Sequence, residues 1–157
     1  MPSVLFVCTA NRYRSPIAAA CFIDVLLKQK KETDWIILSA GTWTVDGLPP
    51  MPEAIKQAKE LGLDIREHRS RKITPLLIQQ TDLILTMEQG QKEALQNEFR
   101  DSATKVYLFS EVVEGIPYDI PDPIMNKSNT KVASKICDLI HTGFEKICIA
   151  AITRSRH

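Results

Sequence analysis

The residues that could carry chemistry begin near the N-terminus, in segment 8–15, which reads Cys-Thr-Ala-Asn-Arg-Tyr-Arg-Ser. The segment follows the apolar run Ser3–Cys8 and precedes Pro16, so it joins a predicted buried strand to a predicted helix. A loop in this position can point successive backbone N–H groups inward, and the helix dipole adds positive potential. Arg14 can grip two oxygens with its planar fork. Segment 8–15 therefore predicts a site for an anion with three free oxygens.

Cys8 lies at the end of the predicted strand, beneath the predicted anion. The loop N–H groups and Arg14 should stabilise its thiolate, which is the nucleophilic form of cysteine. The hydroxyl of Ser15 can donate to that sulfur or cap the helix. An isolated cysteine is more often an inert buried thiol, but the position of Cys8 before an arginine-bearing helix start favours a nucleophile.

The loop pattern Cys8-x5-Arg14-Ser15, with Asn11 three residues after the cysteine, resembles that of the low-molecular-weight protein tyrosine phosphatases. The pattern of that family is Cys-x-Gly-Asn-x-Cys-Arg-Ser near the N-terminus, between a strand and a helix. The resemblance covers essentially the whole chain and predicts one domain of this family over residues 1–157. Further similar segments are Ser39-Ala40-Gly41-Thr42 followed by Trp43, then His68, Thr86-Met87-Glu88 and Pro121-Asp122-Pro123.

The resemblance implies a two-step hydrolysis of phosphotyrosine in proteins. Cys8 attacks phosphorus to form a phosphocysteine, Arg14 holds the phosphoryl oxygens, and Asp122 is the general acid and later the general base. Arg14 and the loop amides supply the charge neutralisation that Mg²⁺ supplies in kinases, so no metal and no cofactor is expected. Asp119 competes for the role of acid, and Asp122 could instead only shape a turn before Pro123.

The resemblance also implies the remaining site residues. His68 braces Asn11, Ser39 is a further supporting residue, and Trp43 forms an aromatic wall. Inorganic phosphate or a similar oxyanion is expected to bind in the same loop. The residues expected to contact substrate are Thr9, Ala10, Asn11, Arg12, Tyr13, Ser15 and Trp43.

Several positions depart from the family pattern. Ala10 replaces a glycine and strains the loop if that position needs a positive φ. Tyr13 replaces the second cysteine, which removes a thiol that could form a disulfide with Cys8 and adds bulk beside the anion. Arg12 places a second cation at the mouth of the site. Ile124-Met125 replace an aromatic pair after Asp-Pro, and Tyr118 is close enough in sequence to substitute for that wall.

The rest of the chain alternates between short apolar runs and amphipathic segments. This alternation predicts an α/β fold, a three-layer α/β/α sandwich around a four-stranded parallel sheet, with the phosphate-binding loop after the first strand. In such sheets the ligand lies beyond the carboxyl ends of the strands, where segment 8–15 falls. The expected strands span 3–8, 35–40, 82–87 and 105–110, and the expected helices start near 15, 52, 74, 88 and 128, the last ending near 151 after a loop over 114–127.

Composition excludes several classes of protein. The chain has 157 residues, 20 Lys plus Arg and 19 Asp plus Glu, which gives a formal net charge of +1. A protein that binds nucleic acid or anionic lipid through charge usually has a larger excess, so neither partner is expected. No apolar run approaches the ~20 residues of a membrane-spanning helix, and no export signal is visible. A cytoplasmic protein is therefore expected.

The cysteines other than Cys8 fit a structural role. Cys21, Cys137 and Cys148 fall on apolar helical stripes, where they are expected in the core. None of the cysteines belongs to a Cys-x-x-Cys pair, which argues against a structural zinc site.

Three alternative functions remain open beside a phosphotyrosine phosphatase. A phosphoarginine phosphatase is known in a branch of the family, but a guanidinium substrate would meet a like charge at Arg12. A thiol-dependent arsenate reductase commonly needs resolving cysteines near the end of the third strand, and segment 83–91 contains none. A non-catalytic phosphate-binding module is compatible with Ala10 and Tyr13.

Overall fold

The computed structural model describes residues 1–123 and 131–155, and its centre is a sheet of four parallel strands in the order β2-β1-β3-β4. In the register of β1 and β2, Cys8 lies opposite Gly41, so both strands end at the same edge of the sheet. This confirms the predicted four-stranded parallel sheet. The strands are β1 (Ser3–Cys8), β2 (Ile36–Gly41), β3 (Leu83–Thr86) and β4 (Val106–Leu108).

Strand β1 is central and buried at every position, as its continuous apolar sequence predicts. Successive side chains of a strand point to opposite faces of the sheet. Val4 and Phe6 therefore belong to one hydrophobic core, whereas Leu5 and Val7 belong to a second core on the other face. One strand thus joins both cores and ends at Cys8.

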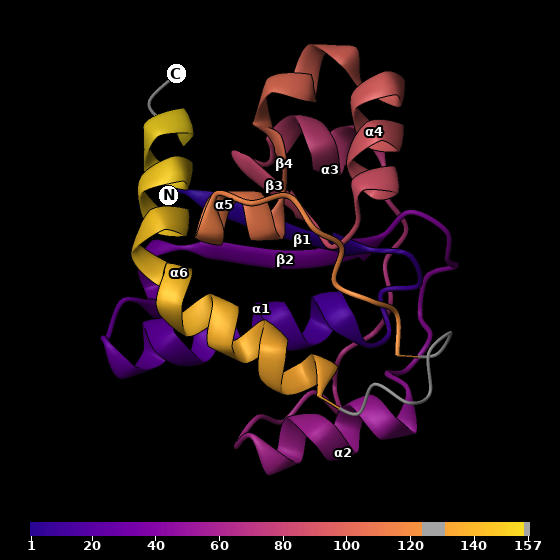
Figure 1. Ribbon diagram of the computed structural model, residues 1–157, viewed down its shortest axis with the longest axis vertical. Helices are drawn as coiled ribbons and strands as arrows, with labels where there is room; N and C mark the ends of the chain where they lie inside the picture. Colours follow the sequence, from indigo (N-terminus) through magenta and orange to yellow (C-terminus); the bar gives the residue numbers. More distant parts are fainter. Residues whose placement is uncertain (124–130, 156–157) are drawn as a thin grey trace.

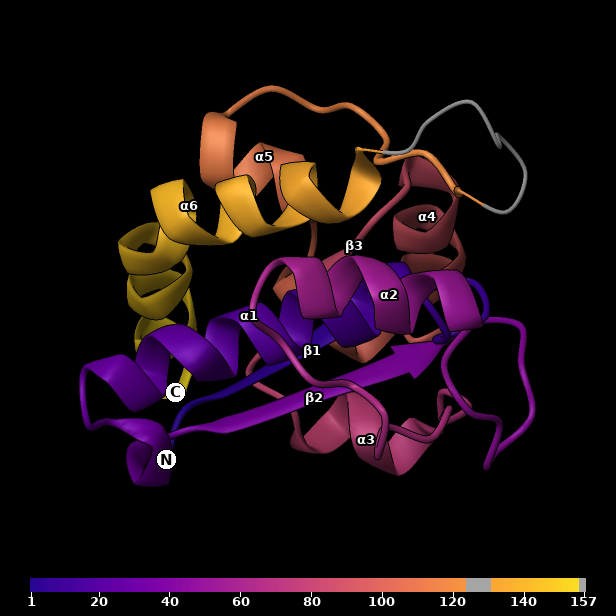
Figure 2. The ribbon, with the colours of Figure 1, turned by 90° about the horizontal axis from the view of Figure 1, so that it is seen from below.

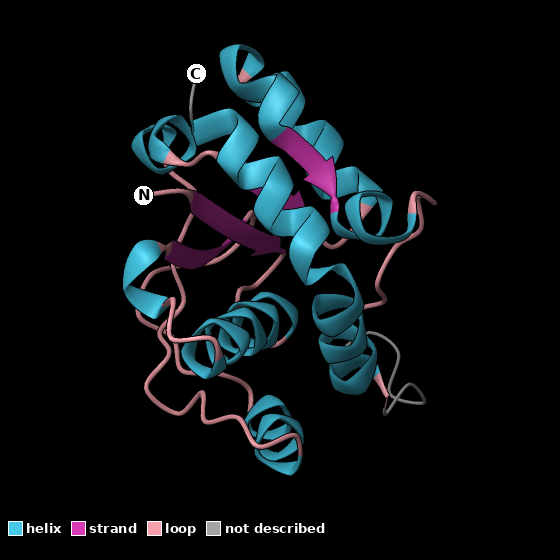
Figure 3. Ribbon diagram, turned by 90° about the vertical axis from the view of Figure 1, so that its left-hand side faces the viewer, coloured by secondary structure: helices cyan, strands magenta, loops and turns pink. Residues whose placement is uncertain are grey.

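Helices cover both faces of the sheet (Figures 1 and 2). One face packs against α1 (Arg14–Lys28), α2 (Pro52–Glu60), α5 (Phe109–Glu114) and α6 (Val132–Ser155). The other face packs against α3 (Pro75–Gln80) and α4 (Gln89–Glu98). Figure 3 shows the strands enclosed between these helices. The short 3-10 helices η1 (Glu32–Asp34) and η2 (Arg100–Lys105) complete the described elements.

The end of the fourth strand was predicted wrongly. The apolar run 105–110 is extended only as far as Leu108, and Phe109 begins α5. Phe109 is fully buried with its ring edge-on to Phe6, and the hydroxyl of Ser110 bonds both the N–H and the carbonyl of Tyr118. A short apolar run does not distinguish a strand from the first turn of a buried helix, so these tertiary contacts decide.

The predicted start of the last helix at Ser128 lies outside the described residues, and the helix extends beyond the predicted end at 151 to Ser155. Within this helix, Gly143 allows a close approach to α5. A Cβ at this position would lie 2.5 Å from Cγ2 of Val113. Non-bonded carbon atoms do not approach each other this closely. The packing of α5 on α6 therefore requires glycine at position 143.

We expect Gly143→Ala to destabilise the fold, although alanine favours helices more than glycine does. Overpacking a core typically costs about 1–3 kcal/mol, whereas the gain in helix propensity is at most about 1 kcal/mol. Denaturant unfolding measures the net change. The control is the same substitution in a Val113→Ala background, where the cost of Gly143→Ala should shrink. An increase in stability in the wild-type background would contradict the prediction.

Candidate active site

The loop between β1 and α1 lies at the carboxyl edge of the sheet and is fixed by backbone hydrogen bonds. The N–H of Thr42 donates to the carbonyl of Cys8 (3.0 Å), and the N–H of Trp43 donates to the carbonyl of Thr9 (2.9 Å). Helix α1 begins at Arg14 without a side-chain cap. The backbone N–H groups of Ala10, Arg12 and Tyr13 have no acceptor among the described residues. These donors are available to a bound anion.

Gly41, at the end of β2, is required by the closeness of this loop. A Cβ on residue 41 would lie 2.6 Å from the carbonyl oxygen of Thr9 and 3.1 Å from the carbonyl carbon of Ala10. The loop backbone therefore packs directly on the backbone of β2.

The sulfur of Cys8 lies in a polar environment inside the loop, and the residue is only 2% exposed. Its Sγ is 3.0 Å from the hydroxyl of Ser15 and 3.3 Å from the backbone nitrogen of Asn11. Both groups can donate to a thiolate. Of the two roles predicted for Ser15, the structure places its hydroxyl at the sulfur and not at a helix cap.

Asn11 holds the loop in shape. It is fully buried and has a positive φ of 58°, a conformation that asparagine tolerates better than most residues. Its Nδ2 donates to the hydroxyls of Ser15 (2.8 Å) and Ser39 (3.0 Å), and its Oδ1 accepts from the N–H of Arg71 (2.8 Å). Its carbonyl oxygen lies 2.8 Å from Nε2 of His68. The structure thus brings Asn11, Ser15, Ser39 and His68 together, as the resemblance implies.

His68 acts in this network as a neutral donor. Burial lowers its pKa, the cations Arg69 and Arg71 lower it further, and the hydrogen bond to the carbonyl of Asn11 opposes them. A neutral imidazole that donates from Nε2 suits a carbonyl acceptor.

Arg14 is buried and held in one orientation. Its Nη1 donates to Oε2 of Glu88 (2.9 Å) and to the carbonyl of Ile120 (2.8 Å), and its Nη2 lies 3.7 Å from Oδ2 of Asp122. The side chain is 3% exposed. The guanidinium fork is therefore positioned before substrate arrives, which reduces the cost of ordering it.

Sequence reasoning assigned no role to Glu88 or Gln91, which support this arrangement. Oε1 of Gln91 accepts from the N–H groups of Met87 and Glu88, and its Nε2 donates to the hydroxyl of Thr9 and to Oε2 of Glu88, each at 3.0 Å. The two residues form a capping box at the start of α4. The spacing Glu-x-x-Gln after an apolar strand was the available signal.

Asp119 and Asp122 occupy different environments. Oδ1 of Asp119 accepts from the N–H of Gln89 (2.8 Å), which ties this carboxylate to the start of α4. Asp122 instead faces Arg14. Of these two carboxylates, Asp122 is therefore the one described beside the guanidinium.

Tyr13 does not add bulk beside the anion site, contrary to the expectation. It is 5% exposed and belongs to the hydrophobic core beneath α1 and α2. Burial raises its pKa, and the carboxylates of Glu53 and Glu60 raise it further. Only its backbone belongs to the loop.

The other departures fall at the surface of the loop or outside it. Among the described non-glycine residues only Asn11 and Lys30 have positive φ, so Ala10 introduces no strain of this kind. Arg12 donates from Nε to the carbonyl of Pro49 (2.8 Å) at the rim. Trp43 follows the carboxyl end of β2 and is 83% exposed, as an aromatic wall requires.

Tyr118 makes its described contacts away from this loop. Its hydroxyl donates to Oε1 of Glu114 (2.6 Å), and the ammonium of Lys135 lies 5.4 Å from its ring centroid. The structure therefore does not bring it to the missing wall. Ile124 and Met125 lie outside the described residues.

The structure is an α/β protein in which Cys8 and Arg14 lie at the two ends of one loop at the edge of the sheet, and known proteins share its fold. The solved structure of a low molecular weight protein tyrosine phosphatase from T. tengcongensis matches with a TM-score of 0.84 and 33% identity, over 93% of this chain and 99% of that chain. A probable low molecular weight protein-tyrosine-phosphatase, EpsP of Ralstonia nicotianae, is 35% identical over 77% of each chain. A protein-arginine-phosphatase of Geobacillus stearothermophilus is 32% identical over 76% of this chain and 77% of its own.

The sequence profile described as low molecular weight phosphotyrosine protein phosphatase matches residues 3–157. The chain therefore belongs to this family of hydrolases, as its loop pattern predicted.

The described residues offer neither a metal site nor a membrane-spanning helix. Within residues 1–123 and 131–155, no group of three or more His, Cys, Asp or Glu side chains is arranged to hold a metal ion. No described helix is both long and apolar enough to cross a membrane.

We expect His68 to make the stability of the wild type depend on pH. Because its pKa is lower in the folded state than the value of about 6.5 in an unfolded chain, the unfolded state binds the proton more tightly. Stability is therefore fully present above about pH 6.5 and falls as the pH drops toward the folded-state pKa. His68→Gln retains a donor for Asn11 without this titration. From neutral to mildly acidic pH, the urea midpoint of the wild type should fall more than that of His68→Gln. Plots of midpoint against pH that run parallel for the two proteins would contradict the prediction.

Proposed function

We propose that this chain hydrolyses phosphotyrosine in proteins through a phosphocysteine intermediate, as a single cytoplasmic domain over residues 1–157. The observation that carries the proposal is one loop at the carboxyl edge of the sheet that begins at the Cys8 thiol and ends at Arg14, whose guanidinium lies 3.7 Å from the Asp122 carboxylate. Both hydrophobic cores pack on this one sheet, which supports a single domain.

In the first step the Cys8 thiolate attacks phosphorus in line with the tyrosyl oxygen. Arg14 and the free loop N–H groups hold the three equatorial oxygens, which carry the charge in the transition state. Asp122 gives its proton to the leaving phenolic oxygen. The hydroxyl of Ser15, 3.0 Å from the sulfur, stabilises the thiolate before attack and again when it leaves.

In the second step water hydrolyses the phosphocysteine. Asp122, now ionised, accepts a proton from that water, and the Cys8 thiolate departs as inorganic phosphate forms. Inorganic phosphate and similar oxyanions should therefore bind the same loop. No cofactor is required, because Arg14 and the amides carry the compensating charge.

The rim of the site favours phosphotyrosine over phosphoarginine as the substrate. The relatives of this chain include proteins named as tyrosine phosphatases and proteins named as arginine phosphatases. Arg12 is held at the rim by its bond to the carbonyl of Pro49, so its positive charge stays near the substrate. A phosphorylated guanidinium would meet this like charge, whereas a neutral phenyl ring would not. Exposed Trp43 offers a stacking surface for that ring.

The remaining alternatives have less support. Arsenate reduction by thiols commonly needs resolving cysteines near the end of the third strand, and Cys21, Cys137 and Cys148 all lie in α1 or α6. A non-catalytic phosphate-binding module loses its rationale, because neither Ala10 nor Tyr13 distorts the loop.

Hydrolysis of an aryl phosphate tests the proposed nucleophile and acid. We expect Cys8→Ser to lower kcat by about three orders of magnitude or more, and Asp122→Asn to lower it by about 10²–10⁴-fold. Asp119→Asn is the matched control and should keep near wild-type activity, because its amide oxygen still accepts from Gln89. Full activity in Cys8→Ser would exclude the assigned nucleophile. Absence of turnover in correctly folded wild type would favour the binding module.

Arg12→Gln tests substrate choice. Removal of the charge should raise kcat/KM for a phosphoarginine peptide relative to a phosphotyrosine peptide by about tenfold, which corresponds to about 1.4 kcal/mol. Lys59→Met, which removes an exposed charge elsewhere, should leave the ratio unchanged. A wild type that prefers phosphoarginine would overturn the proposed substrate.

A further inference from the structure

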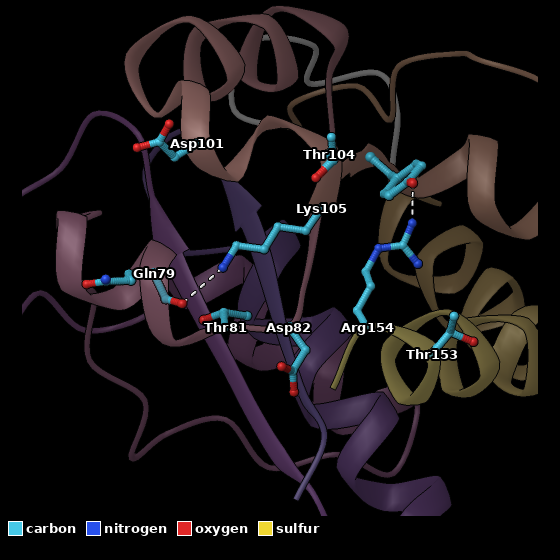
Figure 4. A pocket seen from close by; sticks show the side chains of 9 residues that line it. Gln79, Thr81, Asp82, Asp101, Thr104, Lys105, Thr153 and Arg154 are labelled. Atoms are coloured by element: carbon cyan, nitrogen blue, oxygen red, sulfur yellow. Dashed lines mark hydrogen bonds between the residues drawn. The ribbon is translucent and has the colours of Figure 1, made fainter. Parts of the chain in front are cut away.

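A second polar pocket lies at the end of the sheet opposite Cys8. It has a volume of about 740 Å³ and opens beside the amino ends of β3 and β4, between the end of α3, η2 and the last turns of α6 (Figure 4). Because the strands are parallel, their amino ends lie a full strand length away from the catalytic loop. This pocket is therefore separate from the site described above.

Two cations line the pocket, and neither is in direct contact with a carboxylate of the described residues. Lys105 extends across it and donates from Nζ to the carbonyl of Gln79 (3.0 Å; Figure 4). Arg154 donates from Nη1 to the carbonyl of Ala150 (2.9 Å), and its guanidinium stacks 4.6 Å from the ring centroid of Tyr107. Among the described residues, neither cation forms a salt bridge. Their described contacts are to carbonyl oxygens, a hydroxyl and a ring face, and the carboxylates of Asp82 and Asp101 line the pocket without pairing with either cation.

The environment of Lys105 disfavours its charge. Burial lowers the pKa of this amine, while the nearby Asp82 partly opposes the shift. Asp82 itself points its Oδ2 at Ser3, accepting from the backbone N–H (2.9 Å) and the hydroxyl (3.1 Å). An anion in the pocket would supply a countercharge in direct contact with Lys105, which Asp82 does not.

Hydroxyl donors complete the lining. Nη2 of Arg154 donates to the hydroxyl oxygen of Tyr107, so the proton of that hydroxyl is left to donate, and it has no acceptor among the described residues. The hydroxyl of Thr104 also has no partner there. An arginine fork, an ammonium and two hydroxyls are the donors that typically bind a phosphate group.

We propose that this pocket binds the phosphate group of a small sugar phosphate, through Lys105, Arg154, Tyr107 and Thr104. The volume lies within the ~300–1,000 Å³ typical of small-molecule sites, which is more than phosphate alone requires. The carboxylates of Asp82 and Asp101 also line the pocket and can accept from the hydroxyls of the sugar. This inference is independent of the proposed catalytic function, because no residue of segment 8–15 takes part.

The test is a titration followed by backbone amide NMR on the Cys8→Ser variant, which prevents turnover. Glucose 6-phosphate is the probe, and inorganic phosphate and glucose are the comparison ligands. We expect saturable shifts at residues 79–82 and 104–107 with glucose 6-phosphate, separate from shifts at residues 9–15. Weaker saturable shifts at the same residues with inorganic phosphate would assign the binding to the phosphate group.

Lys105→Met and Arg154→Gln together should weaken binding at residues 79–82 by at least about tenfold, the loss expected for a charge-assisted hydrogen bond. Shifts at residues 9–15 should persist. The matched control, Lys59→Met with Arg66→Gln, removes the same charges elsewhere and should leave both sites unchanged. If the double variant unfolds, the same comparison is made with Lys105→Met alone.

Three outcomes would overturn the inference. The first is the absence of saturable shifts at residues 79–82 and 104–107 at millimolar glucose 6-phosphate. The second is equal affinity in Lys105→Met and the parent protein. The third is a response to glucose as strong as that to its phosphate ester.

Discussion

The loop between β1 and α1 depends on one buried amide. Asn11 turns the backbone through a left-handed conformation, and its side chain and carbonyl then bond three neighbouring segments. Without those bonds the backbone of the loop would lose its support, and a buried amide without partners is costly. The shape of the loop is therefore a consequence of satisfying Asn11. Cys8 takes its place within that constraint, because the N–H of Asn11 also points at its sulfur.

Electrostatic balance is the second requirement. Arg14 is buried beside two carboxylates, Glu88 in contact and Asp122 slightly farther away. Before substrate binds, these carboxylates satisfy the guanidinium, so its burial is tolerated. When a dianion binds, it takes over part of the charge compensation of Arg14, so the guanidinium depends less on these carboxylates. The same ion cluster thus holds Arg14 in one orientation in the free protein.

Much of this architecture is readable from local sequence, and the limits have physical causes. The strand Ser3–Cys8 and the loop after it are identifiable because a continuous apolar run and a chemically distinctive octet are both local signals. The roles of Glu88 and Gln91 were missed because polar residues at the start of a helix are usually solvent-exposed capping residues. Their contacts with Arg14 and Thr9 come from a segment remote in sequence. The buried position of Tyr13 and the helical turn at Phe109 were also missed, since both depend on partners remote in sequence.

The absence of a side chain at Gly41 determines which substitutions the loop between β1 and α1 tolerates. Every other amino acid carries a Cβ, and that atom would press on the carbonyl of Thr9. Position 41 therefore accepts no substitution without moving the loop, although glycine offers no side chain to a bound molecule. A screen that scores activity alone would mark this glycine as indispensable together with Cys8, and the cause would be the space that it leaves for the loop backbone.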